Sequence, residues 1–130
     1  MKTLIVEDDA VSASLLRTIL SAHSECDVAE DGEKAVALFR KARNGSPYDL
    51  ICLDIMLPGK DGQSVLRDIR SIEADAGVPA PDGVKIIMIT ALGDKDNVMG
   101  AFRSQAEAYI VKPIRKGKVI AELKELGFVG

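Results

Sequence analysis

The sequence predicts an α/β fold in which a doubly wound, five-stranded parallel sheet is covered by helices on both faces. Short apolar runs alternate with segments whose apolar residues recur at helical spacing, and this pattern repeats five times along the 130 residues. Alternation of this kind is typical of βα units and therefore of a parallel sheet. Three of the apolar runs are also unbroken, as strands buried on both faces must be.

The five strands are predicted from the apolar runs. The first, third and fourth runs are continuously apolar, whereas the second alternates polar with apolar residues, as an edge strand can. The predicted strands are residues 3–6, 26–30, 50–53, 86–89 and 108–111.

The helices are predicted from apolar residues spaced three and four apart. The residues that mark them are, in chain order, Val11, Leu15, Leu16, Ile19 and Leu20; Val36 and Phe39; Val65, Leu66, Ile69 and Ile72; Val98, Ala101 and Phe102; and Val119, Ile120, Leu123 and Leu126. Residues 74–83 contain two glycines and two prolines, so we expect an extended surface connection there.

Right-handed crossovers with helices on both faces favour the strand order 2-1-3-4-5. In this order Cys26 and Cys52 lie two strand spacings apart, about 9–10 Å. A disulfide requires Cα atoms closer than about 7 Å, so we expect two reduced core thiols, as in a cytoplasmic protein.

Composition restricts the class of protein. Hydrophobic residues make up 47% and charged residues 28% of the chain, which is typical of one globular domain. The net charge of −3 argues against direct binding to nucleic acid. No apolar stretch approaches the length of a membrane span, and the apolar run after Lys2 is too short for a signal peptide. We therefore expect a cytoplasmic location without membrane contact.

Acidic residues follow two of the predicted strands. Glu7, Asp8 and Asp9 come directly after the first strand, and Asp54 comes directly after the third. Clustered carboxylates repel one another unless a positive charge lies among them, and oxygen ligands suit Mg²⁺. The sequence therefore predicts a divalent cation at these strand ends.

The predicted topology brings these acids together. Open α/β sheets bind ligands at the carboxyl ends of their strands, where the winding reverses, and here the reversal lies between the first and third strands. Glu7, Asp8 and Asp54 meet in that crevice. The fourth strand adds Thr90 and the fifth adds Lys112, so a hydroxyl and an ammonium join the carboxylates.

Four segments in this order resemble the receiver domain of two-component response regulators. They are residues 4–9, residues 53–62 with the sequence LDIMLPGKDG, residues 89–91 and residues 109–113. The resemblance covers essentially the whole chain. It implies a flavodoxin-like (βα)5 fold and a phosphorylation-dependent signalling switch.

The resemblance also implies a metal site. It makes Asp54 the phosphoryl acceptor and assigns Mg²⁺, or Mn²⁺ in its place, to Glu7, Asp8, Asp54 and the backbone carbonyl of Met56. Asp9 then stands outside the inner shell. A cation bridging acceptor and phosphoryl group reduces the repulsion between two anions.

Further residues are implied as partners of the phosphoryl oxygens. Lys112 supplies a positive charge, Thr90 a hydroxyl and Ala91 a backbone amide. Pro113 is expected to follow a cis peptide bond, as is usual in the family.

The resemblance implies that Thr90 and Tyr109 respond to the phosphoryl group as a switch. The fourth helix, near Gly93, Asn97 and Gly100, is predicted to be weakly held, because a helical glycine costs about 1 kcal/mol relative to alanine. The face formed by the fourth helix, fifth strand and fifth helix is the expected surface for a downstream protein. Many receivers have glycine where this chain has Gln105, so the end of the fourth helix is not fixed by the resemblance.

Each assignment has a simpler alternative. Asp54 could only cap the turn that follows it, Glu7 and Asp8 could be solvated loop acids, Thr90 could be β-branched filler, Lys112 a surface lysine and Tyr109 a plain core-edge aromatic. Lys60 and Asp61 are expected to be solvated turn residues.

Two other classes of protein share parts of the pattern. A Mg²⁺-dependent phosphatase with an aspartyl-phosphate intermediate typically has a second Asp two residues after the nucleophile, where this chain has Met56. A flavodoxin needs a phosphate loop after the first strand, where this chain has three acids. Rapid turnover of many phosphoesters would favour the first class, and a yellow chromophore the second.

We therefore expect residues 1–130 to form one receiver domain without an effector domain. Its donor would be a histidine kinase or a phosphotransfer protein. It would catalyse its own phosphorylation and dephosphorylation but turn over no separate substrate.

Overall fold

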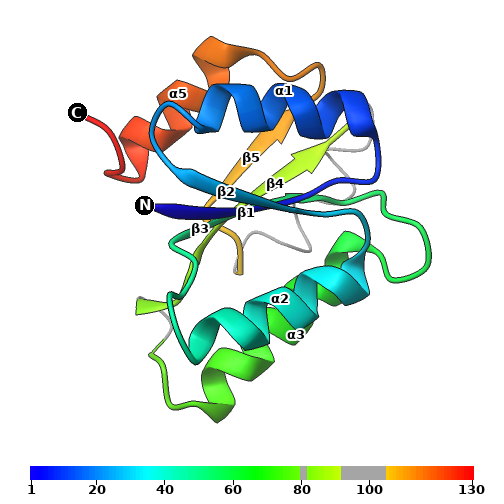
Figure 1. The fold of residues 1–130 in the computed structure, drawn as a ribbon, viewed down its shortest axis with the longest axis vertical. Coiled ribbons are helices and arrows are strands. Elements are labelled where there is room, and N and C mark those ends of the chain that lie inside the picture. Colours follow the sequence, from blue (N-terminus) through cyan, green and yellow to red (C-terminus); the bar gives the residue numbers. More distant parts are fainter. Residues whose placement is uncertain (80–81, 92–104) are drawn as a thin grey trace.

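The computed structural model describes residues 1–79, 82–91 and 105–130, and these form a five-stranded parallel sheet (Figure 1). The strand order is β2-β1-β3-β4-β5, as predicted. The strands are β1 (Lys2–Val6), β2 (Glu25–Ala29), β3 (Leu50–Asp54), β4 (Lys85–Thr90) and β5 (Ala108–Val111). β2 begins and ends one residue earlier than predicted, because Glu25 pairs with Lys2 at the start of β1.

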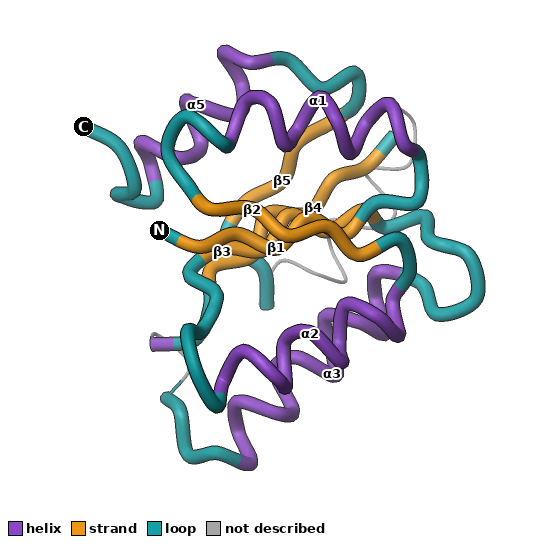
Figure 2. Tube along the Cα trace, viewed as in Figure 1, coloured by secondary structure: helices purple, strands orange, loops and turns teal. Residues whose placement is uncertain are grey.

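Helices cover both faces of the sheet. α1 (Ala10–Leu20) and α5 (Lys116–Glu125) lie on one face, whereas α2 (Gly32–Arg43) and α3 (Gly62–Asp75) lie on the other (Figure 2). The helix predicted around residues 98–102 lies outside the described residues. The doubly wound arrangement is thus present in the part of the chain that the structure describes.

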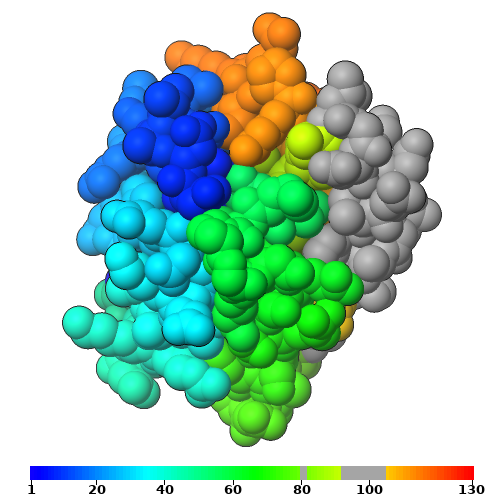
Figure 3. Space-filling view, turned by 90° about the vertical axis from the view of Figure 1, so that its right-hand side faces the viewer, coloured from blue at the N-terminus to red at the C-terminus, as the bar shows by residue number. Residues whose placement is uncertain are grey.

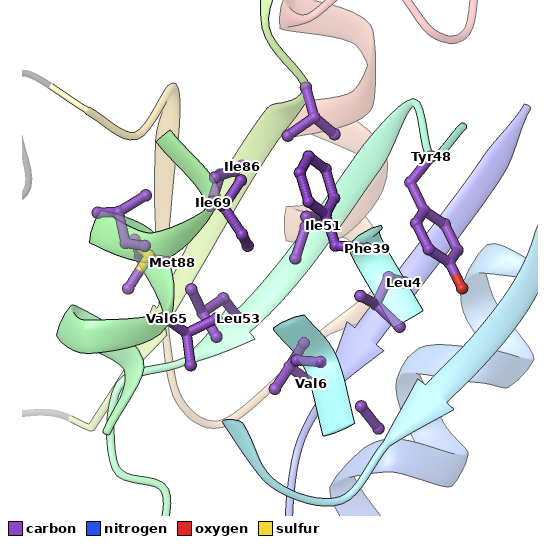
Figure 4. Packing of buried hydrophobic residues seen from close by; sticks show 14 of the residues in the cluster. Leu4, Val6, Phe39, Tyr48, Ile51, Leu53, Val65, Ile69, Ile86 and Met88 are labelled. Atoms are coloured by element: carbon purple, nitrogen blue, oxygen red, sulfur yellow. The ribbon is translucent and has the colours of Figure 1, made fainter. Parts of the chain in front are cut away.

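Each face of the sheet has its own hydrophobic core. Side chains from β1, β3 and β4 alternate between the two, because successive residues of a strand point to opposite faces. Leu4, Ile51 and Ile86 pack toward α2 and α3 (Figure 4), whereas Ile5 and Ile87 pack toward α1 and α5. These five side chains are fully buried, which explains why the strands are unbroken apolar runs.

The prediction for the α1 face was partly wrong. Leu16, Ile19 and Leu20 are buried as expected, but Val11 is 76% and Leu15 42% exposed. Ala13 takes their place in the buried stripe. Val11 and Leu15 each lie two residues from Ala13, about 200° around the helix axis, so they point away from the sheet.

An aspartate caps each of the first three helices. Asp9, Asp31 and Asp61 each accept a hydrogen bond from the backbone N–H three residues later, at 2.8–3.1 Å. Capping satisfies one of the unpaired N–H groups of the first turn. Asp61 was expected to be a solvated turn residue; it is exposed, and it also caps α3. Lys60 was expected to be solvated as well, but its Nζ lies 2.5 Å from Asp68 Oδ2.

Two smaller predictions agree with the structure. Cys26 and Cys52 are buried free thiols. The bond between Lys112 and Pro113 is cis. Among the residues that the structure describes, none of the helices is both long and apolar enough to cross a bilayer.

Candidate functional site

The carboxyl ends of the central strands deliver the candidate site residues to one edge of the sheet. Glu7 follows β1, Asp54 ends β3, Thr90 ends β4 and Lys112 follows β5. Figure 3 looks onto this edge, where the segments after β1 (blue), β3 (green) and β5 (orange) border one another. The structure therefore brings together the residues that the topology predicted to meet.

Three carboxylates form a cluster at this edge. Glu7, Asp8 and Asp54 each place an oxygen so that the three atoms lie within 4.8 Å of one another. Glu7 and Asp54 are buried, whereas Asp8 is exposed. Among the described residues, Glu7 Oε2 is a buried side-chain oxygen without a hydrogen-bond partner. Oxygen ligands that converge around an unsatisfied buried oxygen fit a hard divalent cation.

The burial of Glu7 has an electrostatic consequence. Desolvation raises the pKa of Glu7 from 4.5 to about 8, and the neighbouring Asp54 carboxylate adds to the shift. Lys112 opposes it but does not cancel it. Burial beside the Asp54 carboxylate therefore favours the protonated form of Glu7, and a cation that binds there competes with that proton.

Lys112 closes the cluster from the side of β5. Its Nζ lies 2.8 Å from Asp54 Oδ2 and 3.4 Å from Glu7 Oε1. Partial burial alone would lower the pKa of Lys112, but the hydrogen bond and charge of Asp54, followed by those of Glu7, outweigh it and raise the pKa. Lys112 is therefore not the plain surface lysine that the sequence alone allowed.

Asp54 is held by both of its oxygens. Oδ1 accepts the Met56 backbone N–H at 2.8 Å, which is the turn-capping contact considered as the alternative for this residue. Oδ2 accepts from Lys112. The two contacts coexist, so capping leaves the Asp54 carboxylate directed at the charged groups. The Met56 backbone N–H thus binds Asp54. The role of the Met56 carbonyl oxygen as a metal ligand stays a prediction.

Asp9 has a different role from its two neighbours. Its Oδ2 accepts the Ser12 N–H at 3.1 Å and the Ser12 hydroxyl at 2.7 Å. These hydrogen bonds lower the pKa of Asp9. Its side chain is thus occupied as the N-cap of α1 and lies outside the carboxylate cluster. That Asp9 takes no part in holding a cation stays a prediction.

The predicted switch residues Thr90 and Tyr109 lie on the neighbouring strands β4 and β5. Thr90 is buried, its hydroxyl lies 3.4 Å from the Ala91 carbonyl oxygen, and its own carbonyl accepts the Lys112 N–H at 2.7 Å. Tyr109 is partly buried and packs against the core under α2 and α3. The switch roles of Thr90 and Tyr109 stay predictions.

Gly62 is a site residue that the sequence argument did not single out. Its N–H donates to the Ile55 carbonyl at 3.0 Å, and a Cβ added at Gly62 would overlap the Asp54 carbonyl oxygen. The signal that could have found it is its position at the start of a helix directly after the Asp54 loop. A glycine there lets α3 pack on the backbone of Asp54.

We expect Gly62→Ala to destabilise the protein, because the added methyl group must displace the Asp54 backbone. Overpacking of this kind costs about 1–3 kcal/mol. The measurement is urea unfolding followed by circular dichroism. Gly45→Ala is the matched control, since a Cβ at Gly45 meets nothing within 4 Å. Equal stability of the two variants would contradict the close packing at Gly62.

The fold and the site together define a class: doubly wound α/β proteins with a carboxylate cluster and a lysine at the sheet's carboxyl edge. Residues 3–124 match the response regulator receiver domain family, so the chain belongs to this family. Receiver domains are phosphorylation-dependent signalling switches that interact with histidine kinases and generally bind Mg²⁺ at an acidic pocket.

Relatives and solved structures support the assignment. The transcriptional regulatory protein ResD of Bacillus subtilis is 38% identical over 126 residues, which are 96% of this chain and 47% of that protein. The regulatory protein VanRB of Enterococcus faecalis is 33% identical over 127 residues, 97% of this chain and 52% of that protein. The chain thus spans about half the length of the curated relatives it matches.

A CheY-like receiver domain structure from Methanospirillum hungatei is 28% identical, with a TM-score of 0.74 over 96% of this chain and 92% of that chain. The family match favours the receiver over the phosphatase and flavodoxin alternatives.

Proposed function

We propose that Asp54 accepts a phosphoryl group from a histidine kinase or phosphotransfer protein and that this modification changes the partner-binding surface of the chain. The observation that carries the proposal is the pairing of the buried Asp54 carboxylate with Lys112 at 2.8 Å, beside the unsatisfied Glu7 oxygen. A carboxylate oxygen so placed can attack the phosphorus of a phosphohistidine donor, so that a P–O bond forms to Asp54 while the P–N bond breaks and the imidazole leaves. The Lys112 ammonium beside it stabilises the negative charge of the transferred group.

Glu7, Asp8, Asp54 and the Met56 carbonyl would hold Mg²⁺, or Mn²⁺ in its place. When bound there, the cation would reduce the repulsion between the acceptor carboxylate and the incoming phosphoryl group. Asp54 provides the attacking oxygen, and the Met56 N–H holds its other oxygen in place.

On the opposite side, Lys112 would move its ammonium from Asp54 to a phosphoryl oxygen. Thr90 would donate its hydroxyl and Ala91 its backbone N–H to the same group. Preorganised donors of this kind stabilise charge as it develops.

The output would depend on Thr90 and Tyr109. A phosphoryl group adds roughly two negative charges. Movement of the Thr90 hydroxyl toward these charges would free space toward which Tyr109, on the neighbouring strand, can turn. The downstream protein would bind near β5 and α5, together with the fourth-helix segment, which lies outside the described residues.

We infer further that the domain turns over no separate substrate and does not itself bind nucleic acid. The net charge of −3 supports the second inference, although relatives such as MtrA of Mycobacterium tuberculosis are named DNA-binding response regulators. The free buried thiols support a cytoplasmic location. The prediction of one domain over 1–130 without an effector stays a prediction, since the matched relatives are about twice as long.

The test is incubation with acetyl phosphate and Mg²⁺, followed by intact-protein mass spectrometry. We expect one phosphoryl group per chain. Unmodified protein in the presence of both reagents, and no binding of beryllofluoride, would contradict the proposal.

The raised pKa of Glu7 predicts that Mg²⁺ binding depends on pH. Because its pKa rises from 4.5 to about 8 on folding, Glu7 takes up a proton, and the metal-free protein should lose stability as pH rises between these values. Mg²⁺ must displace that proton, so its affinity should rise roughly tenfold per pH unit and level off above a pH of about 8.

Isothermal titration calorimetry across this range measures the slope. Glu7→Gln is the control, because the variant has no proton to displace and its affinity should vary little with pH. A steep slope retained in Glu7→Gln would assign the proton to another group.

A further inference from the structure

Arg70 on α3 is a nearly buried arginine whose role the phosphoryl-transfer site does not explain. Its side chain is 18% exposed. The Nε and Nη2 atoms both donate to the Gln105 carbonyl oxygen, at 2.9 and 2.7 Å. Nη2 also lies 3.0 Å from a Glu107 carboxylate oxygen. Arg70 therefore forms hydrogen bonds to Gln105 and Glu107, which lie just before the first residue of β5.

These contacts hold the segment just before β5. The Glu107 N–H donates to the Ile86 carbonyl at 3.0 Å, and the Ile86 N–H donates to the Glu107 carboxylate at 2.7 Å. The same carboxylate accepts a hydrogen bond from Arg70, which also donates to the Gln105 carbonyl. The start of β5 is therefore held by Arg70 and the Glu107 side chain as well as by the backbone of β4.

The other side of the guanidinium is fixed as well. Nη1 donates to Glu73 at 2.7 Å and to the Val84 carbonyl at 2.9 Å, while the buried Glu73 accepts the Val84 N–H at 2.6 Å. A Cβ at Gly83 would lie 2.7 Å from Glu73 and 2.8 Å from Arg70. Glu73 and Arg70 therefore lie so close to the backbone of Gly83 that a residue with a Cβ would displace them.

α3 connects this network to the phosphoryl acceptor. Its first residue, Gly62, packs on the Asp54 backbone, and Arg70 lies two turns further along. β5 then runs from Glu107 back to the site, where Lys112 meets Asp54. The contacts form a closed path from Asp54 through α3, Arg70 and β5 to Lys112.

We propose that Arg70 is a positioning residue for the phosphoryl-transfer reaction: it fixes the start of β5 so that Lys112, at the other end, meets Asp54. This inference rests on the proposed function. β5 is a short strand at the edge of the sheet, so its position depends on how its two ends are held. The planar guanidinium has donors on all three nitrogens and so reaches the Gln105 and Val84 carbonyls and the Glu73 and Glu107 carboxylates together. The single ammonium of a lysine cannot reach all four.

The first experiment measures the rate of phosphorylation by acetyl phosphate at saturating Mg²⁺. Arg70→Gln and Glu107→Ala should each lower the rate on the order of tenfold, less than the hundredfold that a 1 Å misplacement of a reacting group can cost. Mg²⁺ affinity should not weaken, because Lys112 is not a ligand. Arg67→Gln is the matched control, since Arg67 is an exposed arginine of the same helix whose guanidinium donates to the Ser64 hydroxyl at 3.2 Å.

The second experiment separates positioning from a general loss of stability. In a Lys112→Ala background the reaction no longer uses the lysine, so adding Arg70→Gln should lower the rate no further. An equal loss in both backgrounds would overturn the proposal, as would an Arg70→Gln rate equal to that of Arg67→Gln. If Arg70→Gln fails to fold, the phosphorylation rate of Glu107→Ala, measured with and without Lys112→Ala, tests the proposal in the same way. Absence of phosphorylation in the unmodified chain would instead contradict the proposed function.

Discussion

Replacement of Asp54 with asparagine is expected to abolish phosphorylation of the chain by acetyl phosphate. The amide lacks the anionic oxygen that attacks the phosphoryl group, while the Asn carbonyl can still accept the Met56 N–H that Asp54 Oδ1 accepts at 2.8 Å. Because the side chains of aspartate and asparagine have the same shape, the backbone conformation around the site should be retained. Intact-protein mass spectrometry after incubation with Mg²⁺ should detect no phosphorylated Asp54→Asn chain.

The matched control is Asp68→Asn. Asp68 is a partly exposed aspartate that pairs with Lys60 outside the carboxylate cluster. This variant should be phosphorylated at the rate of the unmodified chain. A phosphoryl group retained on Asp54→Asn would place the acceptor elsewhere. Turnover of many phosphoesters by the unmodified chain would instead favour the phosphatase alternative.

The fold was predictable because burial acts on local pattern. Leu4, Ile51 and Ile86 are fully buried, and the strands that carry them are recognised by unbroken apolar runs. The face of α1 was less predictable. Val11 and Leu15 fit the helical period as well as the buried residues do. Contact with the sheet decides which of two adjoining helix faces is buried, and the spacing of apolar residues carries no information about that contact.

The candidate site was predictable for a similar reason. Parallel strands end at one edge, so residues that follow them must meet there, and Glu7, Asp54 and Lys112 do. Arg70 gave no such signal, because its partner Gln105 lies 35 residues away and offers only a backbone carbonyl. Gly62 was missed because its importance lies in how closely the Asp54 backbone approaches it.

The three acids after β1 illustrate how one sequence feature divides between two tasks. Glu7, the first of the three, follows β1 directly and is buried, while Asp9, the third, is the N-cap of α1. Asp8 lies between them and is exposed. A strand that passes directly into a helix therefore supplies two carboxylates of the cluster and the helix cap within three residues.

This division predicts opposite results for neighbouring substitutions. Asp8→Asn removes a carboxylate of the cluster and should weaken Mg²⁺ binding by at least about a hundredfold, the upper end of what losing an outer-shell partner costs. Asp9→Ala should leave Mg²⁺ affinity nearly unchanged but lower the melting temperature, because the Ser12 N–H loses its acceptor. Calorimetric titration and thermal unfolding measure the two quantities.

Asp9→Asn decides between the two roles, because asparagine caps a helix about as well as aspartate but carries no charge. We expect this variant to keep both the melting temperature and the Mg²⁺ affinity of the unmodified chain. Mg²⁺ binding weakened in Asp9→Asn as much as in Asp8→Asn would shift the ligand assignment by one residue. Because Asp9 Oδ2 accepts two hydrogen bonds from Ser12, its side chain is already committed to α1, and we expect the cation to depend on Glu7, Asp8 and Asp54.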